Sequence, residues 1–388
     1  MTSESHDGEV DAGTALGDGT RAVHAGKPDP VPGQPLALGP VFAGPYHLGT
    51  DGDPTKQFYY GRNDNPTVHA FEAALEELEG GPSVVFPSGM GAVAALLSTV
   101  LAAGDRLVIP GDGYFGTRVY AEQELAGIDV VAVATTELAG FAAGGGLDGV
   151  ALVLAETPNN TRLDVVDLSV LVPAARAAGC LVAVDNTVAT PLGQRPLALG
   201  ADFSYASDTK ALSGHSDVLL GHVASADPAR AARLRTWRTR GGSIPGPFEV
   251  WLAHRSLGTL HLRLDRQAAN AHALAGALLG HRQVRDLRWP GLPEDPAHDV
   301  VTRQHLRPVG MLSFVLPDAD AVRQVLRSCR IAVAATSFGG LHTTIDRRAQ
   351  WGGDDVPEGY VRVSCGCEDA VDLVQDLLRA LDGLGVAA

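Results

Sequence analysis

One lysine stands out among the residues that could do chemistry. The 388-residue chain holds three lysines against 27 arginines, so arginine serves as its general surface cation. Lys210 ends the run Ala-Ser-Asp-Thr-Lys, directly after the apolar segment 201–206. A lysine amine can lose its proton and attack a carbonyl carbon, whereas an arginine side chain stays protonated. A surface lysine after a strand is the simpler interpretation of Lys210 alone, but its surroundings favour covalent chemistry.

Acidic residues end two other apolar runs. Asp185 closes Leu-Val-Ala-Val-Asp, and Glu156 closes Ala-Leu-Val-Leu-Ala-Glu. A carboxylate at the end of a buried strand is costly unless a cation lies beside it. A pyridinium nitrogen would satisfy Asp185, which would keep the ring protonated as an electron sink while Lys210 forms an imine. The alternative is that Asp185 caps the next segment.

Residues suited to a phosphate group occur in two places. Gly89 and Met90 lie between an expected strand and an expected helix, where backbone N–H groups and the helix dipole bind anions. Ser207 and Thr209 flank the lysine and could donate hydroxyl hydrogen bonds to the same phosphate. Tyr114, at the start of another expected helix, could stack on a cofactor ring. Taken singly, these residues also fit an ordinary turn and a half-buried tyrosine.

The elements that must position these residues alternate between helix and strand from residue 67 to 223. Apolar runs without alternation, separated by helical segments, predict a parallel sheet covered on both faces, with its site at the carboxyl ends of the strands. The expected strands are 83–86, 106–109, 130–133, 151–155, 181–184 and 202–206. The expected helices include 68–78, 89–101 and 166–178.

Three parts follow from these patterns. Residues 1–66, rich in Pro, Gly and polar side chains, predict an N-terminal tail and an inter-subunit arm, with 1–19 disordered. Residues 67–257 form the cofactor-binding large domain, and 258–388 a smaller α+β C-terminal domain. Its expected elements are a long helix after 257, strands 311–316, 331–334 and 360–364, and helices 319–328 and 368–384.

Composition excludes several classes of function. The net charge of −15 argues against a nucleic-acid or anionic-membrane partner. We see no segment of transmembrane length and no signal peptide. Four irregularly spaced cysteines predict reduced thiols and a cytoplasmic setting. The Cys-x-Cys pair has no second ligand cluster nearby, so we predict no metal site.

The ordered set of motifs resembles the Cys/Met metabolism family of pyridoxal-phosphate (PLP) enzymes, which includes cystathionine γ-lyase, cystathionine γ-synthase and methionine γ-lyase. The resemblance runs from about residue 20 to the C-terminus. It implies fold type I of the PLP-dependent transferases, an α/β fold whose large domain has a mostly parallel seven-stranded sheet. The motifs are Tyr60-Gly61-Arg62-x-x-Asn65-Pro66-Thr67, Ser88-Gly89-Met90, Asp112-Gly113-Tyr114-Phe115-Gly116-Thr117, Glu156-Thr157-Pro158-Asn159-Asn160, Asp185-Asn186-Thr187, Ser207-x-Thr209-Lys210 with Gly214-His215-Ser216-Asp217, and Gly359-Tyr360-Val361-Arg362-Val363-Ser364.

The resemblance also implies catalytic and cofactor-binding roles. Lys210 is similar to the Schiff-base lysine and proton shuttle, Asp185 to the pyridinium partner, and Tyr114 to the ring-stacking tyrosine and acid/base. The cofactor is pyridoxal 5'-phosphate. Its phosphate would be bound by Gly89, Met90, Ser207 and Thr209.

Substrate and subunit contacts follow from the same resemblance. Arg362 matches the arginine that binds the α-carboxylate of an amino-acid substrate, assisted by Ser337 and Asn160. Tyr60 and Arg62 match a pair that reaches the cofactor phosphate of the neighbouring subunit. The resemblance therefore implies shared active sites in a homotetramer built from two dimers.

The predicted reaction is γ-elimination on L-cystathionine or a related γ-substituted amino acid, giving cysteine, 2-oxobutanoate and ammonia in transsulfuration. The alternatives are γ-replacement on an O-acyl homoserine, as in the γ-synthase, and the reactions of cystathionine β-lyase or methionine γ-lyase. A PLP-fold scaffold or regulator is a further alternative, which the intact Lys210, Asp185 and Arg362 disfavour.

The chain departs from the family pattern in places that bear on the substrate. Thr336 stands where enzymes that handle cystathionine usually have a glutamate, and Glu249 or Asp346 could supply the missing charge. Thr161 replaces a usual proline. The segment 341–351 differs throughout. Neither Phe115 nor the glycine after it is the cysteine of methionine γ-lyases, which lowers that alternative.

Overall fold

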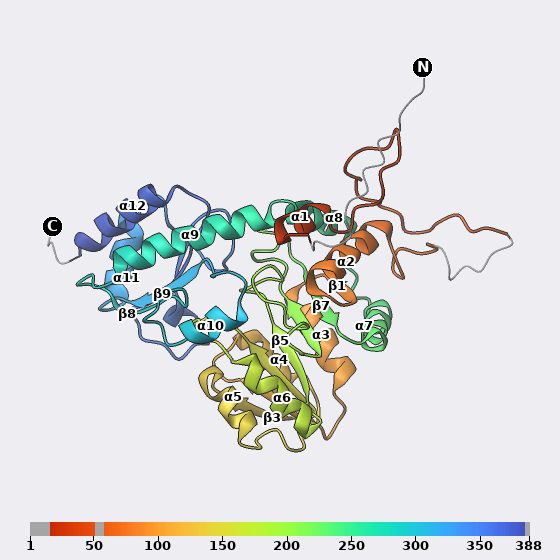
Figure 1. The fold of residues 1–388 in the computed structure, drawn as a ribbon, viewed down its shortest axis with the longest axis horizontal. Coiled ribbons are helices and arrows are strands. Elements are labelled where there is room, and N and C mark those ends of the chain that lie inside the picture. Colours follow the sequence, from red (N-terminus) through yellow and green to blue (C-terminus); the bar gives the residue numbers. More distant parts are fainter. Residues whose placement is uncertain (1–15, 51–57, 385–388) are drawn as a thin grey trace.

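The computed structural model describes residues 16–50 and 58–384. It consists of two β-sheets, each covered by helices, with a long helix running past both (Figure 1). Residues 1–15 of the expected disordered tail lie outside the described part. The prediction that the tail reaches residue 19 is wrong at its end, because the helix α1 begins at Asp18. The arm, residues 30–50 and 58–65, projects from the body in Figure 1.

The large sheet has seven strands in the order β1-β7-β6-β5-β4-β2-β3. All neighbouring pairs are parallel except those that involve β7, which runs antiparallel to β1 and β6. The mostly parallel seven-stranded sheet and the α/β fold class are therefore confirmed. The strands are β1 (Ser83–Phe86), β2 (Arg106–Pro110), β3 (Asp129–Val133), β4 (Leu152–Glu156), β5 (Leu181–Asp185), β6 (Phe203–Ala206) and β7 (Gly221–Ser225).

Helices on both faces explain why the strand sequences are apolar without alternation. Along β4, Leu152 and Leu154 pack in the core cluster that includes α3 (Gly89–Val100) and α7 (Pro228–Gly241). Val153 and Ala155 point the other way, into the cluster with α5 (Thr135–Ala143) and α6 (Leu168–Ala178). Since side chains alternate along a strand, burial on both faces requires every position to be apolar.

The second sheet has five strands in the order β10-β11-β12-β9-β8. Its strands are β8 (Arg285–Arg288), β9 (Met311–Val315), β10 (Val333–Ala334), β11 (Thr344–Arg347) and β12 (Tyr360–Ser364). The sequence pattern predicted β9, β10 and β12 but not β8 or β11, because Arg, Asp and Thr interrupt the apolar pattern of these two short strands. The last helices are α10 (His298–Gln304), α11 (Ala319–Ser328) and α12 (Ala370–Asp382).

Local signals fix the ends of α2 (Pro66–Glu79) as the sequence predicts. The Asn65 side chain accepts a hydrogen bond from the Thr67 N–H at 2.9 Å, and Pro66 occupies the first helical position. Gly80 ends the helix with φ of 83°, a conformation that suits glycine. The remaining helices are α1 (Asp18–His24), α4 (Phe115–Gln123), α8 (Pro247–Leu257) and the 3₁₀ turn η2 (Arg348–Trp351).

The long helix α9 (Leu260–Leu278) connects the two sheets. Its first turns pack with the core around α2 and α8, and its last turns pack against the second sheet. Three buried polar side chains on α9 donate to backbone carbonyls of separate loops. Arg263 contacts Ala211 and Leu212, Gln267 contacts Gly339 and Gly340, and Asn270 contacts Gly366 and Glu368. The domain division at residue 258 remains a prediction.

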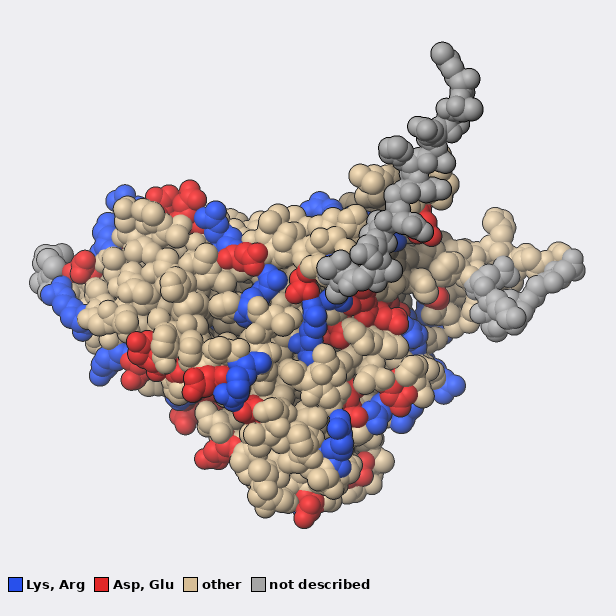
Figure 2. All heavy atoms as spheres, viewed as in Figure 1, with Lys and Arg blue, Asp and Glu red and all other residues tan. Residues whose placement is uncertain are grey.

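The surface in Figure 2 carries both signs of charge. Lys and Arg side chains are scattered among Asp and Glu over the face drawn there. Within residues 16–50 and 58–384, no helix has both the length and the apolar character needed to cross a membrane.

A buried charged cluster ties β7 to its surroundings. His222, as an imidazolium, donates from Nδ1 to Asp208 at 2.6 Å and from Nε2 to Glu79 at 3.1 Å, and all three side chains are fully buried. Burial alone would lower the pKa of His222, but Asp208 and Glu79 raise it to about 10. The imidazolium therefore neutralises carboxylates that α2 and the loop after β6 bring inside.

We predict that His222→Leu lowers the free energy of unfolding by about 3–5 kcal/mol at neutral pH, because it leaves buried carboxylates without a cation. Because its pKa is raised, protonated His222 contributes its full stabilisation of the fold below the ordinary pKa of 6.5. That contribution to the free energy of unfolding decreases as pH rises through about 10. The difference between variant and parent should therefore shrink over that range. Urea unfolding at fixed protein concentration measures it.

His69→Leu is the matched control, because the His69 side chain is 68% exposed and lies 3.9 Å from Asp64. A surface pair of this kind contributes less than about 1 kcal/mol. Equal stability of the two variants would contradict the role assigned to His222.

Candidate active site

Two acidic side chains meet at the carboxyl edge of the large sheet. The register of β4 and β5 pairs Glu156 with Asp185, the last residue of each strand. Asp185 Oδ1 accepts the Thr187 N–H at 2.9 Å, so the capping interaction considered from the sequence is present. Burial raises the pKa of Asp185, which the bond to Thr187 opposes. A cation beside the carboxylate would relieve that cost.

Glu156 organises the loops around this edge. Its Oε2 accepts the Tyr114 N–H and its Oε1 accepts the Asn160 N–H, each at 2.6 Å. Burial, and then the nearby Asp185 charge, raises the pKa of Glu156 to about 8. One carboxyl group thus fixes both the start of α4 and the loop after β4.

Lys210 lies in the loop after β6, where the Asp185 charge acts on its amine. Burial lowers the pKa of its amine, the positive charge of Arg362 adds to this, and Asp185 opposes it. The Lys210 amine lies 5.5 Å from the centre of the Phe338 ring, and the Arg362 guanidinium lies 5.3 Å from the same ring. Phe338 therefore stands beside both cations.

A buried arginine on α9 holds the loop that follows Lys210. Arg263 donates to the carbonyls of Ala211 at 2.5 Å and of Leu212 at 3.0 Å. Gly214 has φ of 70°, and a Cβ there would lie 1.9 Å from Arg263 Nη1. Glycine is thus required at 214 both for the backbone conformation and for the close approach of the guanidinium.

The start of α3 forms a cradle of closely approaching backbone. Ser88 caps the helix by accepting the Gly91 N–H at 3.0 Å. A Cβ on Gly89 would lie 2.7 Å from Ser207 Cβ, so only glycine brings the two segments this close. The Thr209 hydroxyl exchanges hydrogen bonds with the backbone of Leu220 at 3.1 and 3.2 Å. The predicted phosphate binders therefore come together at one helix N-terminus.

Arg362 lies at the opposite end of the site, in the buried centre of β12. Its Nη1 donates to Asn160 Oδ1 at 2.6 Å and to the Asn160 carbonyl at 3.0 Å. Its Nη2 donates to the Ser337 carbonyl at 3.1 Å and to Asp346 Oδ2 at 3.2 Å. Ser337 has a positive φ of 75°, an uncommon conformation for a residue with a side chain. Burial, together with the nearby Arg348 charge, lowers the pKa of Arg362 to about 10, so its guanidinium stays protonated at neutral pH.

A cavity of about 500 Å³ gathers nearly all of the predicted site residues. Lining it are Gly89, Met90, Tyr114, Asn160, Asp185, Ser207, Thr209, Lys210, Ser337 and Arg362. Tyr114 is 40% exposed, and the centre of its ring lies 5.2 Å from that of Phe115. Tyr60 and Arg62 do not line this cavity. They lie on the arm, where the Arg62 guanidinium stacks 5.4 Å from the Tyr60 ring.

The chemistry of these side chains fits one cofactor. The Lys210 amine can bond to an aldehyde, Asp185 can pair with a protonated ring nitrogen, and the N–H groups at the start of α3 can bind a phosphate. The glycine cradle supports the fit, since a Cβ at Gly89 would fill the space beside Ser207. A mostly parallel sheet with this site at its carboxyl edge defines the class of fold type I PLP-dependent enzymes.

Comparison with known proteins gives the family. The sequence model of the Cys/Met metabolism PLP-dependent enzymes matches residues 34–382. A Streptomyces coelicolor protein, named provisionally as a cystathionine γ-lyase, is 51% identical, with coverage of 98% of this chain and 97% of its own length. The cystathionine γ-synthase of Mycobacterium bovis is 35% identical, with coverage of 94% and 97%. The chain therefore belongs to the Cys/Met metabolism family, and its cofactor is pyridoxal 5'-phosphate.

A solved structure agrees with this assignment. The methionine γ-lyase CalE6 of Micromonospora echinospora is 36% identical and superposes with a TM-score of 0.88, covering 94% of this chain and 99% of its own. A second structure of CalE6 is described as a cystathionine γ-lyase. One protein with this fold thus carries the names of two reactions, so the fold alone does not distinguish between them.

Several residues of the site carried no assigned role in the sequence. Glu156 was recognisable as an acid after an apolar run, but its bonds to two separate loops were not. Phe338, Arg348 and Trp351 also line the cavity. Arg348 adjoins Arg347, and the sequence offers no signal that distinguishes the buried arginine from the more exposed one.

We predict that Lys210→Ala removes the absorbance band of the lysine-bound cofactor and lowers turnover by at least about 10³-fold, because it removes both the covalent attachment and the proton-transfer group. Absorption spectra and steady-state rates measure the two effects. Lys27→Ala, which alters an exposed lysine after α1, should leave both unchanged. A Lys210→Ala protein with the parental spectrum and rate would refute the assignment.

Proposed function

We propose that this protein is a carbon–sulfur lyase that carries out γ-elimination on L-cystathionine or a closely related γ-substituted amino acid. The reaction consumes water and releases cysteine, 2-oxobutanoate and ammonia, as in transsulfuration. The observation that carries the proposal is the placement of the Lys210 amine and the Arg362 guanidinium beside one Phe338 ring, at 5.5 and 5.3 Å. An amino acid whose carboxylate binds Arg362 would have its α-carbon near that amine.

The carboxylate site holds one buried donor without a partner among the described residues, beside a guanidinium that is already oriented. Arg362 is held between Asn160 and Asp346, which orients its guanidinium before any substrate binds. The Nδ2 group of Asn160 is buried without a hydrogen-bond partner among the described residues, so it can serve a bound carboxylate. The left-handed backbone of Ser337 directs its carbonyl to Arg362. A planar guanidinium with such neighbours suits a carboxylate geometrically.

Proton transfer at the α-carbon requires a neutral amine. Burial and the charge of Arg362 lower the pKa of Lys210 and so favour that form. When bound, PLP supplies the electron sink that stabilises the charge left on the α-carbon. The partly exposed Tyr114 can stack on the cofactor ring and exchange a proton with the departing sulfur.

The similarity to a relative named for γ-elimination supports the lyase over its alternatives. Thr336 lines the cavity without a charge for the distal ammonium of cystathionine. Asp346 does not compensate, because Arg348 and Arg362 bind it, and Glu249 is not among the residues lining the cavity. This weakness favours γ-replacement as the second candidate; β-elimination and γ-elimination of methionine remain the other family reactions.

We predict that the enzyme releases 2-oxobutanoate from L-cystathionine faster than it makes cystathionine from O-succinyl homoserine and cysteine, because water completes the first reaction without a second bound substrate. Chromatographic quantification of both products in parallel reactions measures the ratio. Lys210→Ala protein is the blank. If cystathionine yields no 2-oxo acid while the acyl homoserine yields cystathionine, the protein is a γ-synthase and the proposal fails.

We further propose that the active sites are shared within a homotetramer of two dimers. The arm carries large apolar residues that are exposed in the single chain: Leu36 is 99%, Phe42 71% and Leu48 58% exposed. Exposed apolar surface of this kind is typical of a contact with another subunit. Tyr60 and Arg62 lie on the same arm and would reach the phosphate of the neighbouring subunit.

The four cysteines are free thiols, which supports the proposed cytoplasmic setting.

Shared sites predict complementation between two inactive variants. Each proposed site takes Lys210 from one subunit and Arg62 from the other. In a mixed dimer of Lys210→Ala and Arg62→Ala subunits, one site lacks both residues and the other site has both. Random mixing of equal amounts should restore about a quarter of parental activity, by counting sites in a two-fold symmetric dimer. Unfolding and refolding the two proteins together, with each refolded alone as control, measures it. Absence of recovery would show that Arg62 serves its own chain.

A further inference from the structure

One departure from the family pattern contacts the loop that follows another. Thr161 stands where a proline is usual, and its hydroxyl donates to Asp354 Oδ1 at 3.1 Å. Arg162 donates from Nη2 to the Asp355 carbonyl at 2.6 Å. The unusual segment 341–351 leads directly into these two aspartates. Thr161 and its neighbour therefore join the loop after β4 to the loop after η2, which follows the unusual segment.

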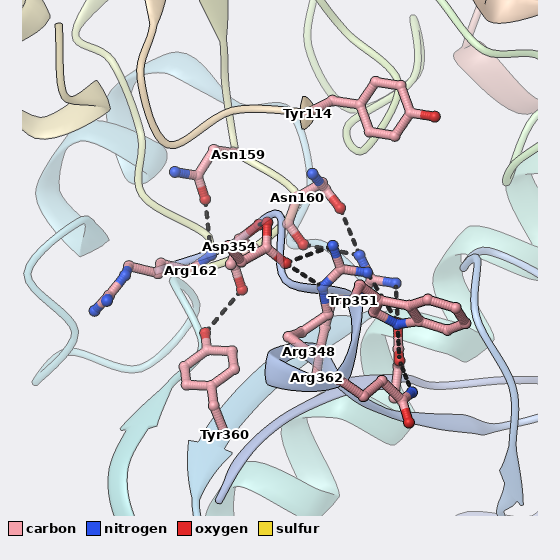
Figure 3. Close-up of polar contacts among 12 residues, drawn as sticks. Tyr114, Asn159, Asn160, Arg162, Arg348, Trp351, Asp354, Tyr360 and Arg362 are labelled. Atoms are coloured by element: carbon pink, nitrogen blue, oxygen red, sulfur yellow. Dashed lines mark hydrogen bonds and ion pairs between the residues drawn. The ribbon is translucent and has the colours of Figure 1, made fainter. Parts of the chain in front are cut away.

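An alternating series of charges leads from this contact to Arg362 (Figure 3). Asp354 Oδ2 accepts from Arg348 Nε at 2.7 Å, and Arg348 Nη1 donates to Asp346 Oδ2 at 2.9 Å. The same oxygen of Asp346 accepts from Arg362 Nη2 at 3.2 Å. We name Thr161, Asp354, Arg348 and Asp346 the ion-pair chain.

The ion-pair chain is buried and balanced in charge. The side chains of Asp346, Asp354 and Arg348 are between 2% and 7% exposed. Buried ions persist only when each has an opposite charge in good geometry, and here the signs alternate up to Arg362. Burial works against the charge of Arg348, yet Asp354 and Asp346 raise its pKa above the ordinary value.

Secondary structure places Asp346 opposite Arg362. The register of β11 and β12 pairs these two residues directly across the strands. The 3₁₀ turn η2 then brings two more donors to Asp346 Oδ1, from Trp351 Nε1 at 2.9 Å and Gln350 Nε2 at 3.2 Å. Asp346 is thus held from several sides, and it holds one edge of the guanidinium while Asn160 holds the other.

We infer that the ion-pair chain positions Arg362 for the substrate carboxylate, so that residues outside the cavity set how tightly an amino acid binds. The inference rests on the proposed role of Arg362. Thr161 and Asp354 are not among the residues lining the cavity, so they act through Arg348, Asp346 and Arg362 as positioning residues. An oriented guanidinium loses less side-chain freedom on binding, which strengthens binding of the carboxylate.

The test compares two ligands that differ only in the carboxylate. L-Norleucine carries an α-carboxylate and no leaving group, and pentylamine is the same molecule without the carboxylate. Titration calorimetry of the holoenzyme gives Kd for each. We expect Arg348→Met and Asp346→Asn to weaken L-norleucine binding about 10-fold and pentylamine less than about 2-fold, since the loss concerns one charge-assisted contact.

Matched variants guard against a general loss of structure. Arg347→Met changes the preceding arginine, which pairs with the exposed Glu358 at 2.6 Å. The Arg347→Met protein should bind both ligands as the parent does. Thr161→Val should weaken L-norleucine about 3-fold through loss of one hydrogen bond, and Thr161→Ser should restore it. In turnover, KM should rise more than kcat falls, because the lost interaction is present in the ground state.

The outcomes separate this inference from the proposed function. Equal weakening of both ligands, or no weakening of L-norleucine, in the Arg348 and Asp346 variants would overturn the positioning role. Arg362→Lys serves as reference, and it should abolish most of the discrimination between the ligands. If Arg362→Lys discriminates between the ligands as the parent does, the proposed carboxylate-binding role of Arg362 fails together with this inference. If Arg362→Lys loses the discrimination but the Arg348 and Asp346 variants keep it, this inference alone fails.

Discussion

The geometry of the site depends on one carboxyl group to which we assign no step of the reaction. Glu156 accepts the N–H of Tyr114 and the N–H of Asn160, both at 2.6 Å, and so joins the cofactor end of the cavity to the substrate end. The parallel register of β4 and β5 places this group beside Asp185, where two acids must share one sheet edge. Their repulsion and burial favour a cation at that edge, which a protonated cofactor ring provides.

Sequence patterns predicted the parts of the fold in which each residue obeys a simple rule. The strands β1, β2, β4, β5 and β6 are buried on both faces over most of their length, so their apolar runs are continuous. The helix α2 carries its own start and stop signals in Asn65, Pro66 and Gly80. Many of the residues that line the cavity lie at strand ends and helix starts, where motifs are local. Lys210, Asp185 and Gly89 could therefore be identified before their distances were known.

The other parts required partners that are distant in sequence. The strand β7 contains His222, whose charge is acceptable only because Glu79 and Asp208 close around it, and no local pattern indicates this. The same holds for β11, in which Asp346 is buried because Arg362 lies across the sheet. Arg347 and Arg348 are identical neighbours along the chain, and only the fold makes one of them part of a buried series of charges.

The polar face of α9 has a consequence for the dimensions of the site. Arg263 holds the loop after Lys210, Gln267 holds the glycines after Phe338, and Asn270 holds the backbone just beyond β12. Residues 263 to 270 span about 10 Å along a helix axis, a length fixed by the helical rise. The helix α9 therefore fixes the separation between the loop that carries Lys210 and the end of the strand that carries Arg362. The distance between the two groups limits the size of amino acid that can bridge them. A rigid helix thus bears on substrate size although none of its side chains is among the residues lining the cavity.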